Sequence, residues 1–202
     1  MTPDSYIDFH AHHPSLRGER VIQDGIDTRG LHPWHLQSAT VSLSEENGKR
    51  ILAIGESGLD RTCSTPYDLQ LQVFRQEVRL SEQLRKPLFL HCVRSIDDIL
   101  RIRHELRARQ PWIWHGFRGH ATQLRQLLPH GFYFSFGIYH HSDAILACPT
   151  DRMLLETDDD TQSPISQLYE EVARELGLPL ETLLRQMQRN YDILFLNSRS
   201  GD

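Results

Sequence analysis

Side chains of the kinds that bind metal ions recur along this chain. The segment Asp8-Phe9-His10-Ala11-His12 places His10 and His12 two residues apart, so in a strand both imidazoles would leave the same face. Four further candidate ligands follow apolar segments: Glu56, His91, His115 and Asp158. Imidazole together with carboxylate favours Zn, Mn, Fe or Ni over Ca, and with Mg these are the divalent ions we expect.

Six ligands are too many for one tetrahedral ion, and they suit two divalent ions that share a bridging carboxylate. Paired ions of this type promote the hydrolysis of phosphoesters and amides. A carbamylated lysine could also bridge, but Lys49 and Lys86 both precede their expected strands. Glu56 is therefore the expected bridge. Asp158 is the expected catalytic group, because a coordinating carboxylate can orient the attacking water and take its proton.

The elements that must position these residues are short apolar runs alternating with helical patterns. We expect strands at 6–10, 28–32, 51–56, 88–92, 112–117, 132–137 and 153–158, with a further short strand possible at 21–26. Helices are expected at 67–85, 96–109, 122–130, 165–176 and 180–196. This alternation predicts an α/β fold with parallel strands. In a TIM-type barrel the carboxyl ends of all strands meet at one mouth, where the six ligands would converge.

Composition limits the possible classes of protein. The chain has 202 residues and a net charge of −5, which suits one domain over residues 1–202 and provides no overall basic field for duplex nucleic acid. No apolar run approaches the length of a membrane helix, and the first residues lack the apolar core of a signal peptide. Three cysteines without paired spacing predict no disulfide framework. We therefore expect a cytoplasmic monomer that does not bind membranes.

Several segments together resemble the TatD-type metal-dependent hydrolases, a deoxyribonuclease-like branch of the amidohydrolase superfamily. The matching segments are DFHAH (8–12), GLHPW (30–34), AIGESGLD (53–60), PLFLHC (87–92), HGFRG (115–119), FYFSFG (132–137) and LLETD (154–158). The resemblance implies that His10, His12, Glu56 and Asp158 hold one ion, and that Glu56, His91 and His115 hold the other. It also implies hydrolysis of phosphodiester bonds, in several members from the 3′ end.

The chain departs from this pattern in four places. Only residues 13–29 separate the first histidine pair from GLHPW, which predicts that one helix–strand–helix unit is missing after the first strand. The barrel would then have about seven strands, or an eighth built from residues 21–26. The usual short His-x-Arg is extended to Arg94, Arg118 replaces a small hydroxyl residue, and no proline follows Asp158.

The leading hypothesis is therefore a two-metal phosphodiesterase. Arg94 and Arg118 could bind phosphate through paired hydrogen bonds, although surface ion pairs are an equally good explanation for both. The expected substrates are DNA or RNA 3′ ends or a small phosphoester, because the net charge disfavours tight duplex binding. Two alternatives stay open: a hydrolase of small esters, lactones or amides, and a non-catalytic metal-binding protein.

Overall fold

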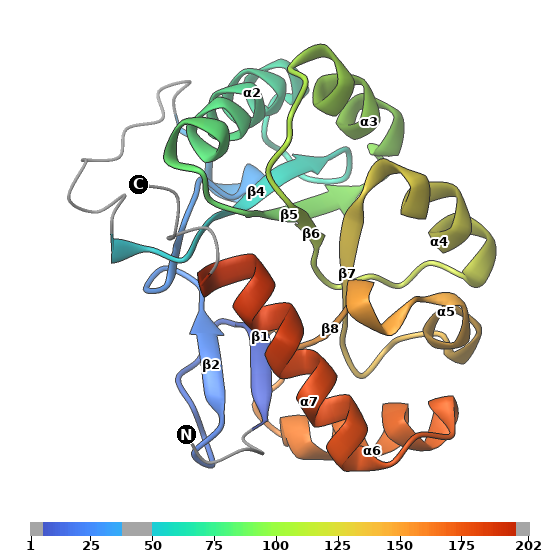
Figure 1. The fold of residues 1–202 in the computed structure, drawn as a ribbon. Coiled ribbons are helices and arrows are strands. Elements are labelled where there is room, and N and C mark those ends of the chain that lie inside the picture. Colours follow the sequence, from blue (N-terminus) through green and yellow to red (C-terminus); the bar gives the residue numbers. More distant parts are fainter. Residues whose placement is uncertain (1–5, 38–49, 197–202) are drawn as a thin grey trace. The chain divides into compact units, whose positions relative to one another are not determined.

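The computed structural model describes residues 6–37 and 50–196, so Lys49 lies outside the described residues. The chain divides into two compact units, which are described separately. Unit 1 joins Met1–Asp24 to His115–Asp202, and unit 2 is the continuous segment Gly25–Trp114 (Figure 1). The prediction of one domain over residues 1–202 is not tested by this division.

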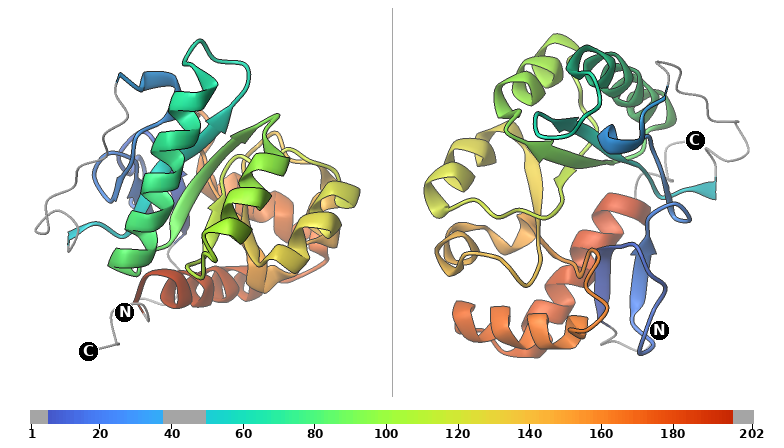
Figure 2. Two further views of the ribbon diagram at one scale, coloured as in Figure 1. Left: turned by 90° about the horizontal axis from the view of Figure 1, so that it is seen from above. Right: turned by 180° about the vertical axis from the view of Figure 1, so that it is seen from behind.

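The described residues of unit 2 form four parallel strands with helices between them. Its strands are β3 (Thr28–Arg29), β4 (Ala53–Asp60), β5 (Leu88–Val93) and β6 (Trp112–Trp114), paired in that order. The helices are the 3₁₀ helix η1 (Pro33–His35), α2 (Tyr67–Leu84) and α3 (Ile96–Glu105). Figures 1 and 2 show α2 and α3 on one side of β4 and β5. The amphipathic pattern of α2 explains this position, since Phe74 is fully buried and its ring lies 5.5 Å from that of Trp112.

Unit 1 combines the first part of the chain with its last part. Its strands are β1 (Ile7–Ala11), β2 (Arg20–Gln23), β7 (Phe132–Phe136) and β8 (Met153–Leu155), and β1 pairs with β2 and β7 with β8 in parallel. The helical elements are α4 (Ala121–Leu127), η2 (Leu128–His130), α5 (Ser142–Ala147), η3 (Thr150–Arg152), α6 (Ile165–Leu176), α7 (Leu180–Tyr191) and η4 (Asp192–Leu196).

Apolar packing joins the two ends of unit 1. The ring of Phe9 in β1 lies 6.4 Å from Tyr191 of α7 and 6.5 Å from Phe195, and Figure 1 shows α7 beside β1. Asn190 of α7 is fully buried and donates hydrogen bonds to the carbonyls of Thr150 and Met153, both at 2.8 Å. These contacts tie the last helix to the entrance of β8.

The parallel α/β architecture predicted from the sequence is confirmed within each unit. The described residues contain eight strands, and β2 is the strand foreseen as a possible eighth at 21–26. The helix expected at 165–176 has those bounds, whereas α5 was not predicted. Among residues 6–37 and 50–196, no helix is both long and apolar enough to cross a membrane.

Candidate metal centre

The backbone of Asp158 is attached to β1 at the histidine pair. Its amide donates to the carbonyl of His10 at 2.9 Å, and its carbonyl accepts from the amide of His12 at 3.1 Å. Asp158 also has a φ of +58°, a left-handed conformation that aspartate tolerates better than most residues. These two hydrogen bonds and this turn place the end of β8 beside β1, so three candidate ligands come together.

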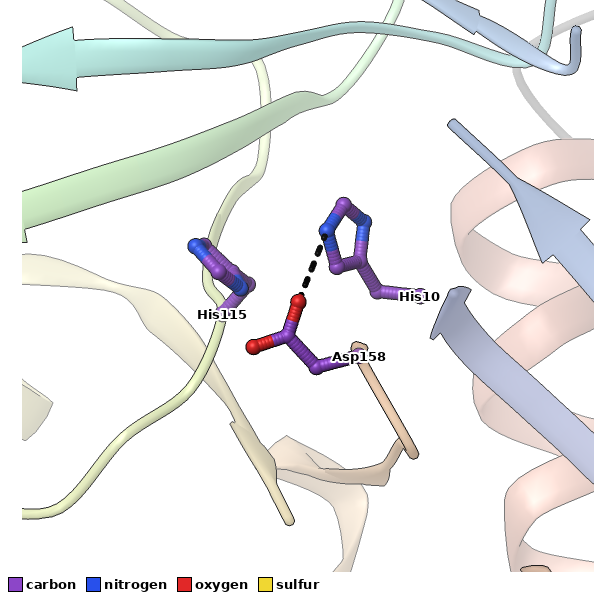
Figure 3. Close-up of side chains that lie close together, drawn as sticks. All are labelled: His10, His115 and Asp158. Carbon is purple, nitrogen blue, oxygen red and sulfur yellow. Dashed lines mark ion pairs between the residues drawn. The ribbon is translucent and has the colours of Figure 1, made fainter. Parts of the chain in front are cut away.

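The side chains of His10, His115 and Asp158 face one another (Figure 3). The His10 Nε2 atom lies 3.9 Å from Asp158 Oδ1, the two imidazole rings have centroids 4.6 Å apart, and the three ligand atoms all lie within 4.8 Å of one another. An ion about 2.0–2.2 Å from each nitrogen and oxygen would fit such spacing. His12 extends the cluster, because its Nε2 lies 3.4 Å from Asp158 Oδ1.

Behind His115 lies Glu156, which the sequence analysis did not single out. Its carboxylate is fully buried, its Oε1 accepts a hydrogen bond from the amide of Gly116 at 2.5 Å, and the same oxygen is 3.5 Å from His115 Nδ1. This contact places an acidic side chain next to the imidazole of His115. A glutamate inside the apolar strand LLETD is the sequence signal that could have identified it.

Asp8 holds the segment next to this cluster. It accepts hydrogen bonds from the amide and the hydroxyl of Thr157, and the hydroxyl also lies 3.2 Å from His13 Nε2. Burial raises the pKa of Asp8 to about 6, although the hydrogen bonds from Thr157 act in the opposite direction. Asp8 therefore couples the start of β1 to the residue before Asp158.

A second cluster lies in unit 2 and contains Glu56, His91 and His32. Glu56 Oε1 is 2.8 Å from His91 Nδ1 and 3.0 Å from His32 Nε2, and these two nitrogens are 3.2 Å apart. The three ligand atoms all lie within 4.8 Å of one another. The structure therefore brings the predicted Glu56 and His91 together and adds His32. His32 is followed by Pro33, a pair that is common in structural loops as well as at sites, so the sequence alone does not assign His32 to the cluster.

Asp60 supports the second cluster from the far side of His91. Its Oδ2 lies 3.2 Å from His91 Nε2 and accepts a hydrogen bond from the indole of Trp34 at 2.7 Å. Burial alone would raise the pKa of Asp60, but hydrogen bonds from Thr62, Trp34 and His91 outweigh it and hold the pKa below the usual range. Asp60 is thus a charged acceptor that fixes the His91 ring.

Glycine allows β4 and β5 to approach closely enough to join Glu56 and His91. A Cβ atom on Gly58 would lie 1.8 Å from the carbonyl oxygen of His91.

Glu77 of α2 is a buried carboxyl group next to this strand pair. The hydroxyl of Ser57 donates a hydrogen bond to Glu77 at 2.5 Å, and the amide of Leu31 donates another at 2.6 Å. The pKa of Glu77 is raised to about 8 because the carboxyl is buried.

The two arginines predicted to bind substrate have different surroundings. Arg94 is exposed directly after β5, with a φ of +52°. Arg118 is also exposed, and its guanidinium carbon lies 5.1 Å from the ring centroid of Tyr139. Tyr139 was not identified from the sequence, because a single tyrosine after a strand carries no distinctive spacing.

Comparisons with known proteins show the family to which this chain is similar. The family model for TatD-related DNases matches residues 8–196. An uncharacterised metal-dependent hydrolase of Buchnera aphidicola is 32% identical over 67% of this chain and 56% of its own length. The 3′-5′ ssDNA/RNA exonuclease TatD of Cronobacter sakazakii is 31% identical over 65% of this chain and 56% of its own. This chain thus spans about half the length of the curated relatives that it matches.

Solved structures confirm the predicted fold class. The YJJV protein, a TatD homologue of Escherichia coli, superposes with a TM-score of 0.68 at 20% identity and covers 84% of this chain and 76% of its own. A TatD-family hydrolase of Entamoeba histolytica gives a TM-score of 0.64 at 18% identity, over 75% and 65% of the two chains. With the family model matching nearly from end to end, this chain belongs to the TatD-related DNase family.

Proposed function

We propose that this protein is a metal-dependent hydrolase that cleaves phosphodiester bonds. The observation that supports this most strongly is the cluster of His10, His115 and Asp158, whose ligand atoms lie within 4.8 Å of one another in a TatD-family chain. The donor set suits a transition metal, because it combines imidazole nitrogens with a carboxylate oxygen. The relatives named as a metal-dependent hydrolase and as an ssDNA/RNA exonuclease point to the same chemistry.

The proposal assigns two divalent ions to the six predicted ligands: His10, His12, Glu56, His91, His115 and Asp158. His32 is added as a candidate seventh ligand, since its Nε2 is 3.0 Å from Glu56 Oε1. Zn, Mn, Mg, Ni and Fe are the candidate metals. Bound divalent ions would neutralise phosphoryl charge and make a water molecule more acidic.

Asp158 is the proposed general base. Its carboxylate is 28% exposed, whereas His10 beside it is fully buried, so of these two side chains only that of Asp158 is accessible to water and substrate. Its backbone hydrogen bonds to β1 hold the backbone of Asp158 beside His10 and His12. The carboxylate would orient the attacking water and accept its proton. Arg118 and Arg94 would bind non-bridging phosphate oxygens.

The proposed substrates are single-stranded DNA or RNA ends, with small phosphoesters as the second candidate. Relatives named as 3′-5′ ssDNA/RNA exonucleases support the first class, and a net charge of −5 disfavours tight binding of long duplexes. A single catalytic domain, a monomeric state and a cytoplasmic location stay predictions.

Metal analysis combined with a substrate panel tests the proposal. We expect about two ions per chain, and cleavage of 3′-ended DNA or RNA oligomers in preference to lactones and simple phosphate esters. Asp158→Asn should lower turnover about 10²- to 10⁴-fold. Fewer than one ion per chain would overturn the two-metal proposal, and turnover of small esters alone would reject the nuclease proposal.

One control concerns the metal count itself. His120, His141 and Asp143 form an exposed trio whose ligand atoms also lie within 4.8 Å of one another. His141→Gln therefore serves as the matched variant: it should leave hydrolysis unchanged and remove any ion bound at this surface. A metal count that falls to zero in His141→Gln would show that the ions belong to the surface trio.

A further inference from the structure

Unit 1 contains a cavity of about 140 Å³ beside the proposed catalytic carboxylate. Three segments line it, each close to the carboxyl end of a strand, and the cavity adjoins the candidate metal centre at Asp158. Its lining includes Arg118, Tyr139, Glu156, Asp158, Asp159 and Asp160. A molecule in this cavity would lie against Asp158.

The lining combines a cation with an exposed aromatic ring. Tyr139 is 67% exposed, so its ring is open to solvent. The Arg118 guanidinium lies 5.1 Å from its ring centroid, within the range of a cation–π interaction. This pairing holds Arg118 at the edge of the cavity, while most of the tyrosine surface stays available to another flat group.

Charge and size restrict what the cavity can accept. The wall of the cavity is acidic, because it contains Glu156, Asp158, Asp159 and Asp160. An anionic ligand would be repelled by these carboxylates, so positive charge from Arg118 and from any bound metal ions must offset the repulsion. Small-molecule pockets usually measure about 300–1,000 Å³, so a cavity of about 140 Å³ is too small for a whole nucleotide. It has room for a phosphate or sugar, and a base would then extend over the rim.

We propose that this cavity receives the terminal nucleotide of a single-stranded nucleic acid, with its phosphate bound by Arg118 and its base stacked on Tyr139. The inference rests on the proposed function and assigns a substrate position to it. Stacking on a tyrosine does not depend on base identity, so the site would accept any of the four bases. Tyr139 is therefore a substrate-binding residue, and Asp158 performs the proton transfer.

Two oligonucleotides and two tyrosine variants test the assignment. One oligonucleotide ends in an ordinary 3′ nucleotide, and the other ends in a 3′ nucleotide that lacks its base. Binding is measured by fluorescence anisotropy on oligonucleotides whose phosphorothioate linkages resist cleavage. KM and kcat are measured separately on oligonucleotides that can be cleaved. Tyr139→Ala should weaken binding and raise KM about 5- to 100-fold for the ordinary end, with little change in kcat. The loss should be clearly smaller for the end without a base, which can lose only the support that Tyr139 gives to Arg118. Tyr139→Phe should bind as the parent does.

The remaining outcomes separate this inference from the proposed function. Equal affinities of Tyr139→Ala and the parent for the ordinary end would overturn the stacking assignment. An equal loss for both oligonucleotides would also overturn it, because the tyrosine would then not contact the base. Binding that depends on Tyr139 without any hydrolysis would support the nucleotide site and reject the catalytic proposal. Failure of the parent to bind either oligonucleotide, with turnover of small phosphoesters, would overturn the nucleotide site alone.

Discussion

His115 is a residue at which catalysis can be separated from folding. Its ring faces His10, and its Nδ1 lies 3.5 Å from the carboxylate of Glu156, so its surroundings are polar on two sides. We predict that His115→Ala lowers hydrolysis at least about 100-fold through loss of a metal ligand. Circular dichroism should show the secondary structure of the parent protein, and an unfolded variant would contradict this prediction.

Glu77 is the residue at which pH should change the stability of unit 2. Its pKa is raised from 4.5 to about 8 by burial, so the folded state holds a proton that the unfolded state releases. The parent protein should therefore lose stability as pH rises from about 4.5 to 8, by a few kcal/mol in total. Below pH 4.5 Glu77 is protonated in both the folded and the unfolded state, so it no longer makes stability depend on pH.

The variant Glu77→Gln tests this dependence. A neutral amide of the same shape cannot lose a proton. The free energy of unfolding of the variant minus that of the parent should therefore be larger at pH 9 than at pH 5. Urea unfolding at the two values measures the difference, and comparison of the two proteins removes the contributions of all other titrating groups. A constant difference between variant and parent across this range would show that Glu77 titrates normally.

Sequence reasoning could identify residues whose type and strand position both carry information. The pattern singles out six candidate ligands because each lies in or just after an apolar segment: His10, His12, Glu56, His91, His115 and Asp158. His32 and Tyr139 were not assigned to a site, because their roles depend on where a loop folds back: His32 Nε2 comes within 3.2 Å of His91 Nδ1, and Tyr139 meets Arg118. Such contacts depend on tertiary packing that periodicity does not encode.

At the level of elements, the close approach of β4 and β5 depends on a glycine. We predict that Gly58→Ala destabilises the protein by about 3 kcal/mol or more, because its Cβ would lie 1.8 Å from the His91 carbonyl oxygen and backbone atoms cannot move aside easily. Metal affinity should fall as well, since His91 would move away from Glu56. Urea unfolding and zinc titration measure the two effects.

Gly177→Ala is the matched control for Gly58→Ala. Gly177 ends α6 with a φ of +63° and has no atom within 4 Å of its would-be Cβ, so alanine there should cost only about 1 kcal/mol and leave zinc binding unchanged. Gly58 does not share the positive φ of Gly177, so a loss at Gly58 no larger than that at Gly177 would show that the contact with the His91 carbonyl is easily relieved.

The elements themselves were predicted unevenly, for physical reasons. The bounds of α6 were clear, because Gly177 follows a strongly amphipathic segment. The helix α5 has only six residues, too few for a helical period to stand out from the surrounding sequence. The strand β4 continues to Asp60, beyond the expected end at residue 56, because Gly55 and Gly58 obscure the apolar pattern.

For the molecule as a whole, bound metal should contribute to stability. A ligand at about 100 times its Kd stabilises the folded state by about 2.7 kcal/mol, which corresponds to a rise in Tm of about 5–10 °C for a chain of this length. We predict that EDTA lowers the Tm by this amount and that added zinc or manganese restores it. An unchanged Tm after chelation would argue against metal binding, and His141→Gln should respond as the parent does.

The arrangement of the two units along the chain sets an order of folding during synthesis. Unit 2 is the continuous segment Gly25–Trp114, whereas unit 1 needs both Met1–Asp24 and His115–Asp202. Translation at about 5–20 residues per second would take roughly 5–20 s to pass through unit 2, which could fold in that interval. The segment carrying His10 and His12 would meanwhile have no access to Thr157, which lies 149 residues beyond Asp8. The cluster shown in Figure 3 can therefore form only after Asp158 has left the ribosome.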